Sequence, residues 1–600
     1  MRDRTGSPVA RWLAVIALGI SAIPLIWTWR STAGQAIASE FPVLDWPEPA
    51  DGEGWVRPGE IAVQLKSGAS NGTLLALGRA LGVPVAWNPT LGAETGVARV
   101  AVPSGMTAEA LLTRLRRDPS VEAADVVHLY RAPVEIDPTP SPVPLQDRSD
   151  SSRWRPNDPR YPEQWNFRMV RAEEAWERSR GKGVVVAVID TGVAYGDTRK
   201  GPVARDFKQT PFVRGYDFVN RDDVPYDDHG HGTHVAGTVA ESTNNREGVA
   251  GLAFEATIMP LKVLNANGGG TSADIAAAIR WAADRGAKVI NMSLGGPFPD
   301  RVMRSACEYA RSRGVTIVCA AGNSGREGVG YPAAFPECIA VSAVGPKGEL
   351  SFYSSWGRQI AIAAPGGDRQ QDPENGGILQ NTIFEGRDDY FQFQGTSMAS
   401  PHVAAVAAMV VSRGITDPED VKAVLQKTAR PKGPSNKYGA GILDAASATR
   451  MAALIHGDGV ARFWMVVGLF AGCFGIGYLR RRAGSRLGYP FWGTAALAFG
   501  LVFPDWLTGF LGMTSGYNLI GHSILIPGAL LVLGAEGKTE RRLLGWMAFG
   551  LVLHLGWEFL RGTTPFGPHI GFWQLLPWVT SNVLIGCSML VSGLTAQRDY

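Results

Sequence analysis

Ser397 is the first residue whose surroundings indicate chemistry. The sequence GTSMASPHVAAVAAMVV over residues 395–411 has helical length and many good helix formers. We therefore expect Ser397 at a helix N-terminus, with its hydroxyl facing solvent. Backbone N–H groups and the helix dipole favour a developing negative charge at that end. A serine in this place often serves only as a helix cap, so a nucleophile needs partners elsewhere in the chain.

Asp190 and His231 are the candidate partners of Ser397. Residues 183–193, GVVVAVIDTGV, form a buried-type β run that carries Asp190 at its end. A carboxylate at the C-terminal end of a parallel strand lies where open α/β sheets place their chemistry. Residues 229–239, HGHGTHVAGTV, lead His231 into a second apolar helix. A serine needs a base to take its proton, and the base needs a third group to orient it, so the three residues predict a nucleophilic triad.

Three sequence blocks resemble those of a known family. VIDTGV, HGTHVAG and GTSMASPHVA match the signature blocks of the subtilisin-like serine peptidases, and the chain order Asp, His, Ser is that of subtilisin. The resemblance runs from about residue 158 to residue 446. It implies that Asp190, His231 and Ser397 are catalytic, and that protein or peptide chains are the substrates.

Two further blocks match the same family. Residues 320–325, AAGNSG, resemble its oxyanion block, so the resemblance implies that the side-chain amide of Asn323 and the backbone N–H of Ser397 bind the oxyanion. Residues 291–296, NMSLGG, resemble the segment that pairs with the substrate backbone and forms a wall of the primary pocket. The substrate-binding residues implied are Ser293, Leu294 and Gly295.

The resemblance also implies a structural calcium site. Residues 157–165, NDPRYPEQW, resemble the start of the mature domain in the thermitase branch, where Asp158 would bind calcium. Asp206 supplies the second carboxylate, although Arg205 stands where the family usually has proline. Asn245 and several carbonyl groups would complete an oxygen-rich set, which suits calcium rather than zinc.

The acidic pair Asp227 and Asp228 directly precedes the HGHGTH segment. Two carboxylates beside a catalytic histidine raise the hypothesis that the enzyme favours substrates with basic side chains.

The elements between these blocks predict an α/β fold. Short β runs alternate with helical segments such as residues 271–285, which favours a mostly parallel sheet with helices on both faces, as in the subtilisin-like family. The peptidase domain is expected over residues 157–450. Its β runs are residues 184–189, 258–263, 289–292, 315–319 and 339–343.

A smaller α+β unit is expected at residues 59–132. Its length and element order resemble the inhibitory prodomains that precede many subtilisin-like peptidases, and an ordinary accessory domain is the alternative. The resemblance implies that the unit assists folding and blocks the cleft until the chain is cut between residues 133 and 156. That segment contains PTPSPVP and is expected to be a linker, as are residues 39–58.

Composition excludes some classes of function and leaves others open. The net charge is +3 with 19% charged residues, which gives no basic excess for binding nucleic acid. Five cysteines are too few for a disulfide framework. Cys319 is expected to be a buried thiol, and Cys307 and Cys338 could pair in an oxidising compartment. The remaining cysteines are Cys473 and Cys587.

Both ends of the chain predict a membrane protein. Residues 1–38 have the arginines, apolar run and Ala-x-Ala site of a signal peptide, with an uncleaved signal anchor as the alternative. Residues 456–600 are expected to form an all-α membrane domain of about five transmembrane helices in the lipid bilayer. Arginines and lysines follow the first and third runs, so the positive-inside rule places the peptidase domain outside the cytoplasm. The five apolar runs are residues 463–479, 490–511, 518–535, 543–560 and 572–594.

Ionisable residues inside these runs leave a second chemistry open. His554 and Glu558 lie four residues apart on one helix face, where they could pair or bind a metal. Asp505 and His522 are the other ionisable residues within the runs.

These observations predict an extracytoplasmic, membrane-anchored serine endopeptidase that is made as a proenzyme. One alternative is a non-enzymatic receptor or scaffold that only binds peptides. Another is a membrane-embedded metal hydrolase or sensor with an accessory peptidase domain. An α/β-hydrolase esterase is disfavoured, because GTSMA lacks the final glycine of G-x-S-x-G and the aspartate precedes the serine.

Overall fold

The computed structural model describes residues 54–132, 135–136, 154–196 and 200–453 of the chain. By internal contacts the chain divides into residues 1–46 and residues 47–600, and all described residues belong to the second part. The predicted signal segment, the five apolar runs and the pair His554 and Glu558 lie outside the described residues. Within the described ranges, no helix combines the length and the hydropathy that crossing a bilayer requires.

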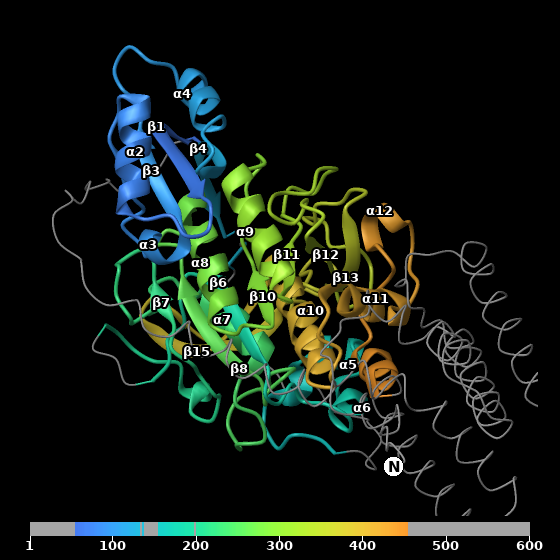
Figure 1. Cartoon of the computed structure of the whole chain (residues 1–600). Coiled ribbons are helices and arrows are strands. Elements are labelled where there is room, and N and C mark those ends of the chain that lie inside the picture. Colours follow the sequence, from blue (N-terminus) through green and yellow to red (C-terminus); the bar gives the residue numbers. More distant parts are fainter. Residues whose placement is uncertain (1–53, 133–134, 137–153, 197–199, 454–600) are drawn as a thin grey trace, which may run out of the picture. The chain divides into compact units, whose positions relative to one another are not determined.

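A seven-stranded parallel sheet forms the centre of residues 154–453 (Figure 1). Its strands are rich in valine, isoleucine and alanine and are buried almost throughout, as expected where helices cover both faces. In spatial order the strands are β13 (Ile360–Pro365), β12 (Cys338–Val344), β11 (Thr316–Ala320), β10 (Val289–Met292), β6 (Val185–Asp190), β8 (Thr257–Lys262) and β7 (Tyr216–Asp217).

Two apolar cores lie on opposite faces of this sheet. In β6, Val186 and Val188 belong to one core, whereas Ala187 and Ile189 belong to the other, as the twofold alternation of a strand requires. The predicted α/β fold with a parallel sheet and helices on both faces is therefore confirmed. The first core holds α7 (His231–Ala240), α10 (Thr396–Val411) and α11 (Pro418–Thr428), and the second holds α8 (Ser272–Asp284) and α9 (Arg301–Ser312).

Helix α8 begins one residue later than the sequence predicted. Thr271 is not its first residue but its N-cap, because the Thr271 hydroxyl accepts a hydrogen bond from Asp274 N at 3.2 Å. The remaining short elements are the helices α5 (Trp165–Met169), α6 (Ala172–Trp176) and α12 (Ser435–Tyr438), and the 3₁₀ turns Tyr161–Glu163 and Arg205–Phe207.

Residues 54–132 form a separate antiparallel sheet with three helices, which we call the N-terminal unit. Its strands are β1 (Val56–Leu65), β2 (Val85–Trp87), β3 (Val97–Ala101) and β4 (Val121–Arg131), and its helices are α2 (Asn71–Leu81), α3 (Gly92–Thr95) and α4 (Ala108–Leu115). The unit has its own apolar core of leucine, valine and isoleucine side chains. Strand β1 starts at Val56, inside the predicted linker 39–58, because Val56 pairs with His128 of β4.

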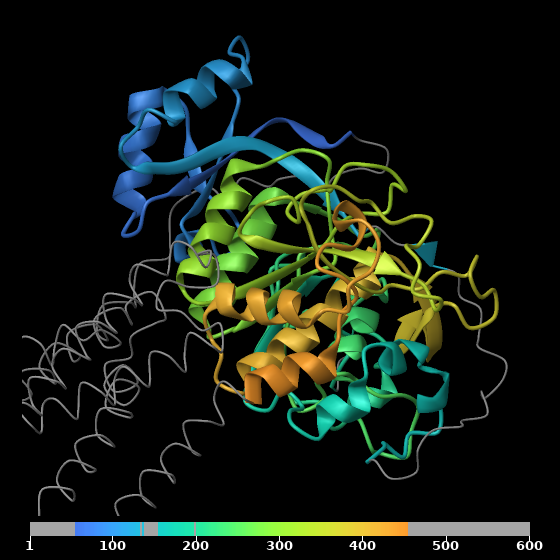
Figure 2. The ribbon, with the colours of Figure 1, turned by 90° about the vertical axis from the view of Figure 1, so that its right-hand side faces the viewer.

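The C-terminal end of strand β4 reaches the peptidase part of the chain (Figure 2). There it pairs antiparallel with β9 (Gly269–Thr271). The segment predicted as a linker over residues 133–156 also contains a short strand, β5 (Glu135–Ile136). It pairs antiparallel with β15 (Arg387–Gln394), the partner of β14 (Ile378–Phe384). This part of the linker prediction was wrong, because pairing with a distant strand, and not local sequence, makes residues 135–136 extended.

The three described cysteines are free thiols. Cys307, Cys319 and Cys338 are all buried. The Sγ atoms of Cys307 and Cys338 lie 4.0 Å apart, about twice the length of a disulfide bond. The buried thiol predicted at Cys319 is confirmed, whereas Cys307 and Cys338 are not joined in this structure.

Candidate active site

Asp190 and His231 form a buried pair at the carboxyl end of the central sheet. Asp190 ends β6, and His231 is the first residue of α7. Asp190 Oδ1 lies 2.6 Å from His231 Nδ1 and also accepts a hydrogen bond from Thr191 N at 2.7 Å. Both side chains are fully buried. The carboxylate therefore fixes the tautomer with a proton on Nδ1, which leaves Nε2 as the basic atom of His231.

Ser397 is the second residue of α10, in the turn where backbone N–H groups have no acceptor within the helix. Its hydroxyl donates to Ser293 O at 3.3 Å. Ser293, which follows the neighbouring strand β10, returns a hydrogen bond from its own hydroxyl to Ser397 O at 2.8 Å. The predicted substrate-wall residue Ser293 thus also holds the start of the helix that carries Ser397.

The expectation of a solvent-facing Ser397 hydroxyl was wrong for this form of the chain, because Ser397 is fully buried. Among the described residues, His231 Nε2 has no hydrogen-bond partner, and the Ser397 hydroxyl donates to a carbonyl instead. The structure joins Asp190 to His231 and shows no serine–histidine hydrogen bond, so the catalytic role of Ser397 with this pair stays a prediction.

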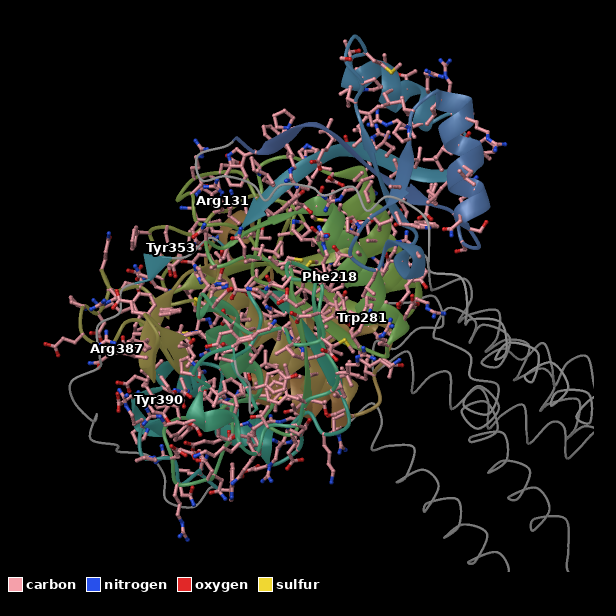
Figure 3. The ribbon with its side chains drawn as sticks, turned by 90° about the vertical axis from the view of Figure 1, so that its left-hand side faces the viewer. Arg131, Phe218, Trp281, Tyr353, Arg387 and Tyr390 are labelled. Carbon is pink, nitrogen blue, oxygen red and sulfur yellow. The ribbon has the colours of Figure 1, made fainter. Side chains whose placement is uncertain are left out.

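The end of β4 lies as an extended strand between Gly295 and β9, and we call the place between these two segments the groove. Arg131, labelled in Figure 3, exchanges two backbone hydrogen bonds with Gly295: Arg131 N donates to Gly295 O at 3.1 Å, and Gly295 N donates to Arg131 O at 2.9 Å. Ala132 N donates to Gly268 O at 3.0 Å. Leu294 is buried in the same apolar core as Tyr130. Of the predicted residues 293–295, Gly295 therefore pairs with an extended segment of the same chain.

Two elements of this groove were missed in the sequence. Gly268 and the two glycines of β9 form the second wall of the groove, since residues 268–271 lie opposite residues 129–132. Their signal was the run GGG, which permits a close approach of two backbones. The other missed element is the end of β15, where Phe393 and Gln394 pair with β5. No local feature of Phe393 or Gln394 distinguishes them from ordinary strand residues.

Asn323 is oriented toward the start of α10. Its side-chain Oδ1 accepts hydrogen bonds from Thr396 N at 2.9 Å and from the Thr396 hydroxyl at 2.8 Å. These two contacts fix which amide atom is the acceptor, so the Nδ2 group is the one that can donate to an oxyanion near Ser397. The predicted oxyanion role of Asn323 stays a prediction.

Two further histidines, His234 and His402, have surroundings that indicate a structural role. His234 Nε2 lies 2.9 Å from Ile378 O, and the ring stacks on Phe393. Burial lowers the pKa of His234 to about 3. Burial likewise lowers the pKa of His402 to about 4, and its ring nitrogens bond Met398 O and the Asn166 amide. Both side chains are therefore neutral packing residues.

Asp227 and Asp228 do not both face a substrate. Asp227 is fully buried, and Asp228 Oδ1 bonds the ammonium of Lys262 at 2.7 Å. The hypothesis that this acidic pair selects basic substrate side chains is therefore wrong for Asp227, because no substrate side chain can reach it.

The structure brings together the three predicted calcium ligands. Asp158 accepts hydrogen bonds from Asn244 N at 2.8 Å and from Asn245 N at 3.0 Å. The Asn245 amide donates to Asp206 Oδ1 at 2.6 Å. Arg205 turns away from this cluster and pairs with Asp388 at 2.6 Å.

Burial makes this acidic cluster electrostatically costly. It raises the pKa of Asp206 to about 7, with the nearby Asp158 adding to the effect. Burial and the charge of Asp206 raise the pKa of Glu241, which lies beneath the cluster. Over the part of the chain that the structure describes, no group of three or more histidine, cysteine, aspartate or glutamate side chains is arranged to hold a metal. A calcium ion here would rely on the two aspartates together with amide and carbonyl oxygens.

Comparison with known proteins places this geometry in a family. The model of the Subtilase family matches residues 181–441. Halolysin of Haloferax mediterranei is 40% identical over 298 residues, which cover 49% of this chain and 54% of halolysin. Thermitase of Thermoactinomyces vulgaris is 36% identical over 278 residues, which cover 46% of this chain and 92% of thermitase.

A solved structure has a similar fold. Fervidolysin from Fervidobacterium pennivorans, a keratinolytic enzyme related to subtilisin, aligns with a TM-score of 0.54 at 24% identity. The alignment covers 67% of this chain and 62% of that one, and at this identity the likeness concerns the fold alone. The extent of the match to thermitase carries the assignment: the chain belongs to the subtilase family and is a subtilisin-like serine peptidase.

Proposed function

We propose that the protein is a membrane-anchored, extracytoplasmic serine endopeptidase made as a proenzyme. The observation that carries the proposal is the buried pair of Asp190 and His231, 2.6 Å apart, beside a serine at a helix N-terminus. A binding protein does not need a carboxylate to fix the tautomer of a buried histidine next to a serine.

In this mechanism Ser397 Oγ attacks the peptide carbonyl while His231 Nε2 takes its proton. Asp190 keeps the proton on Nδ1 and stabilises the imidazolium. The Ser397 N–H and the Asn323 amide bind the oxyanion of the tetrahedral intermediate. His231 then protonates the leaving amine, and water hydrolyses the acyl-enzyme by the same steps in reverse.

The substrate would bind as an extended chain. The backbone groups of Gly295 and Gly268 already hold residues 131 and 132 in that form, and the end of β15 holds residues 135–136. These contacts support strand pairing on both sides of Ser397 as the binding mode.

The N-terminal unit would act as the inhibitor of the same chain. Its docking is supported by the largely buried ion pair of Arg99 with Asp274 at 3.0 Å, and by the ion pair of the exposed Glu122 with the buried Arg280 at 2.8 Å. Because Asp274 and Arg280 belong to α8, the unit rests on the peptidase fold while β4 fills the groove. The cleavage expected between residues 133 and 156 falls largely on residues outside the described ones.

Structural calcium would bind at Asp158, Asp206 and Asn245. The support is the convergence of two buried carboxylates with raised pKa values, which a cation would relieve. When bound, the ion would neutralise these charges and fix the loop of residues 242–249.

Membrane anchoring rests on the apolar runs after residue 456 and on their charge pattern. An external protease added to intact cells should remove the peptidase domain and leave a tag placed after Tyr600 protected. Loss of that tag together with the peptidase domain would contradict the proposed orientation.

The experiment that tests the activity is labelling of the full-length protein with a fluorophosphonate probe. We expect the processed wild type to be labelled, the Ser397→Ala variant to remain unlabelled, and the form that retains its N-terminal unit to react more slowly. If a correctly folded, processed wild type takes no label, the catalytic proposal fails.

A further inference from the structure

Asp227 is a buried carboxylate that the catalytic mechanism does not use. Its Oδ1 accepts hydrogen bonds from the Thr191 hydroxyl at 2.8 Å, from His229 N at 3.0 Å and from Gly230 N at 2.8 Å. Its Oδ2 accepts from Thr233 N at 2.8 Å and from the Thr233 hydroxyl at 2.6 Å. Five donors converge on one side chain with no exposed surface.

These donors come from both segments that carry the catalytic pair. Thr191 follows Asp190, and its backbone N–H donates to Asp190 Oδ1 at 2.7 Å. The Thr191 hydroxyl, which donates to Asp227, also accepts from Gly232 N at 2.8 Å. Gly232 follows His231 at the start of α7. The carboxylate of Asp227 therefore ties the loop after β6 to the first turn of α7.

Close packing leaves this junction little freedom. A Cβ atom on Gly232 would lie 2.2 Å from Gly192 O, so the helix start and the loop after β6 already touch. Asp190 O accepts hydrogen bonds from Val263 N and Leu264 N at the end of β8. A change in the Asp227 contacts must therefore shift one catalytic segment relative to the other.

The negative charge of Asp227 has a buried counter-charge. Lys262 is also fully buried, and its ammonium bonds Thr191 O and Leu264 O. Burial raises the pKa of Asp227, but Lys262 and the hydrogen bonds from Thr233 and Gly230 lower it by more, so the pKa lies below the usual range. The side chain is consequently ionised and can accept from all five donors.

We propose that Asp227 is a positioning residue for catalysis, whose carboxylate sets the placement of His231 relative to Asp190 and Ser397. It touches no substrate and acts only through the Asp190–His231 pair. The inference rests on the proposed triad.

The first test compares Asp227→Asn with a matched variant, Asp217→Asn, in the full-length, processed enzyme. Asp217 is also fully buried and accepts two backbone N–H groups, Val219 N and Asn220 N, but bonds neither catalytic segment. In Asp227→Asn an NH₂ group replaces one carboxylate oxygen. It would face two hydrogen-bond donors from which it cannot accept. We expect kcat for a chromogenic peptide anilide to fall by about 10²-fold, with little change in KM.

The pH profile separates positioning from loss of stability. In Asp227→Asn the acid limb of kcat/KM should move to lower pH, because His231 loses a nearby negative charge and its fixed contact with Asp190. In Asp217→Asn the profile should overlay that of the wild type, even if Tm falls. Equal kcat losses at equal Tm losses, with superimposed profiles, would overturn the inference.

A second pair of variants keeps the inference testable if Asp227→Asn does not fold. Thr191→Val removes the hydroxyl that joins Asp227 to Gly232 N, and Thr191→Ser retains it. We expect kcat to fall about tenfold or more in the valine variant and to remain near wild type in the serine variant. Equal activities of the two variants would contradict a positioning role. Failure of wild-type labelling would instead overturn the proposed triad itself.

Discussion

At the scale of single residues, the described chain is set for catalysis but is not yet in a reactive arrangement. The Ser397 hydroxyl donates to Ser293 O instead of to His231. Asp190 and His231 are already joined by a 2.6 Å contact, so a serine–histidine hydrogen bond would require the Ser397 hydroxyl to leave the Ser293 carbonyl. The serine is therefore the member of the triad that must move.

The role of Asn323 can be tested by Asn323→Ala. In subtilisin, loss of one oxyanion donor costs about 10²- to 10³-fold in kcat, and we expect a similar loss here with a small change in KM. Ser324→Ala is the matched neighbour. The measurement is steady-state kinetics on a peptide anilide, and a loss confined to KM would contradict the oxyanion role.

The site residues that the sequence predicted are those carried by contiguous motifs. Asp190, His231, Ser397 and Asn323 each sit in a block whose types and spacing indicate a role, and the structure brings these blocks together. Asp227 was misread as a contact for basic substrates because burial cannot be read from the sequence near HGHGTH. Four of its five hydrogen-bond donors lie on residues that follow it, and the fifth, the Thr191 hydroxyl, lies 36 residues earlier, a contact that only the fold defines.

At the scale of elements, strand β9 limits what can enter the groove. A Cβ atom on Gly270 would lie 2.2 Å from Val263 O, whereas one on Gly269 would lie no closer than 3.8 Å to any neighbour. Of these two glycines, only Gly270 is sterically required, because a side chain there would collide with Val263 O.

This difference predicts opposite outcomes for two similar substitutions. Gly270→Ala should displace β9, raise KM and lower kcat/KM at least tenfold, since such overpacking typically costs about 1–3 kcal/mol. Gly269→Ala should bind substrate within about twofold of the wild type, because its methyl group meets only ordinary contacts. The measurement is KM and kcat/KM of the two processed variants and of the processed wild type. An equal effect of both alanines would show that the β9 backbone is not a substrate wall.

Docking of the N-terminal unit is expected to weaken as pH rises. Burial lowers the pKa of His128, but the 3.0 Å hydrogen bond to Asp300 and the negative charges of Asp300 and Asp125 together raise it by more, so the net shift is upward. Burial and the charge of Asp300 also raise the pKa of Asp125. Groups with raised pKa values hold protons more tightly when docked. The stability from His128 is therefore present below about pH 6.5 and is lost as pH rises through its raised pKa.

The measurement is Tm against pH in the Ser397→Ala chain, which cannot cut itself. We expect Tm to decline between about pH 6 and 8, and the decline to be smaller when His128→Gln is added. Parallel curves for the two proteins would exclude His128 as the cause.

Strand pairing explains why some elements could not be predicted from the sequence. The main strands and α11 were recognisable from their apolar runs, and most predicted boundaries differ by one residue from the observed ones. For helix α8 the reason is that its N-cap Thr271 was counted as the first helical residue. Strands β5 and β9 consist of Glu-Ile and Gly-Gly-Thr, which have no strand period of their own. They are extended only because distant backbones pair with them.

At the scale of the whole molecule, the acidic cluster of Asp158 and Asp206 links stability to a cation. We expect added calcium to raise Tm, with about 2.7 kcal/mol of stabilisation at a concentration one hundred times Kd. Asp206→Asn should abolish this response and lose little stability in chelator, because it removes a buried charge whose pKa is raised to about 7. Asp417→Asn, which alters only the cap of α11, should retain the full calcium response.

Thermal unfolding with calcium and with chelator checks this prediction. Equal calcium responses in the wild type and Asp206→Asn would place any bound ion elsewhere.

After cleavage, the two pieces of the chain would be bound in the groove with different strength. Residues 129–132 pair with β9 on one side, and residues 135–136 pair with β15 on the other. Upstream of the groove, the N-terminal unit adds its whole docked surface, whereas downstream, within the described ranges, residues 135–136 add a two-residue pairing with β15. After cleavage, the downstream end would leave quickly and the unit would stay as a separate molecule. Its local concentration would then fall from the millimolar range of a short tether to that of the surroundings. Activation would then depend on the enzyme concentration. At low concentration the released N-terminal unit would dissociate and the enzyme would become active, whereas at high concentration released units would bind and inhibit the enzyme molecules around them.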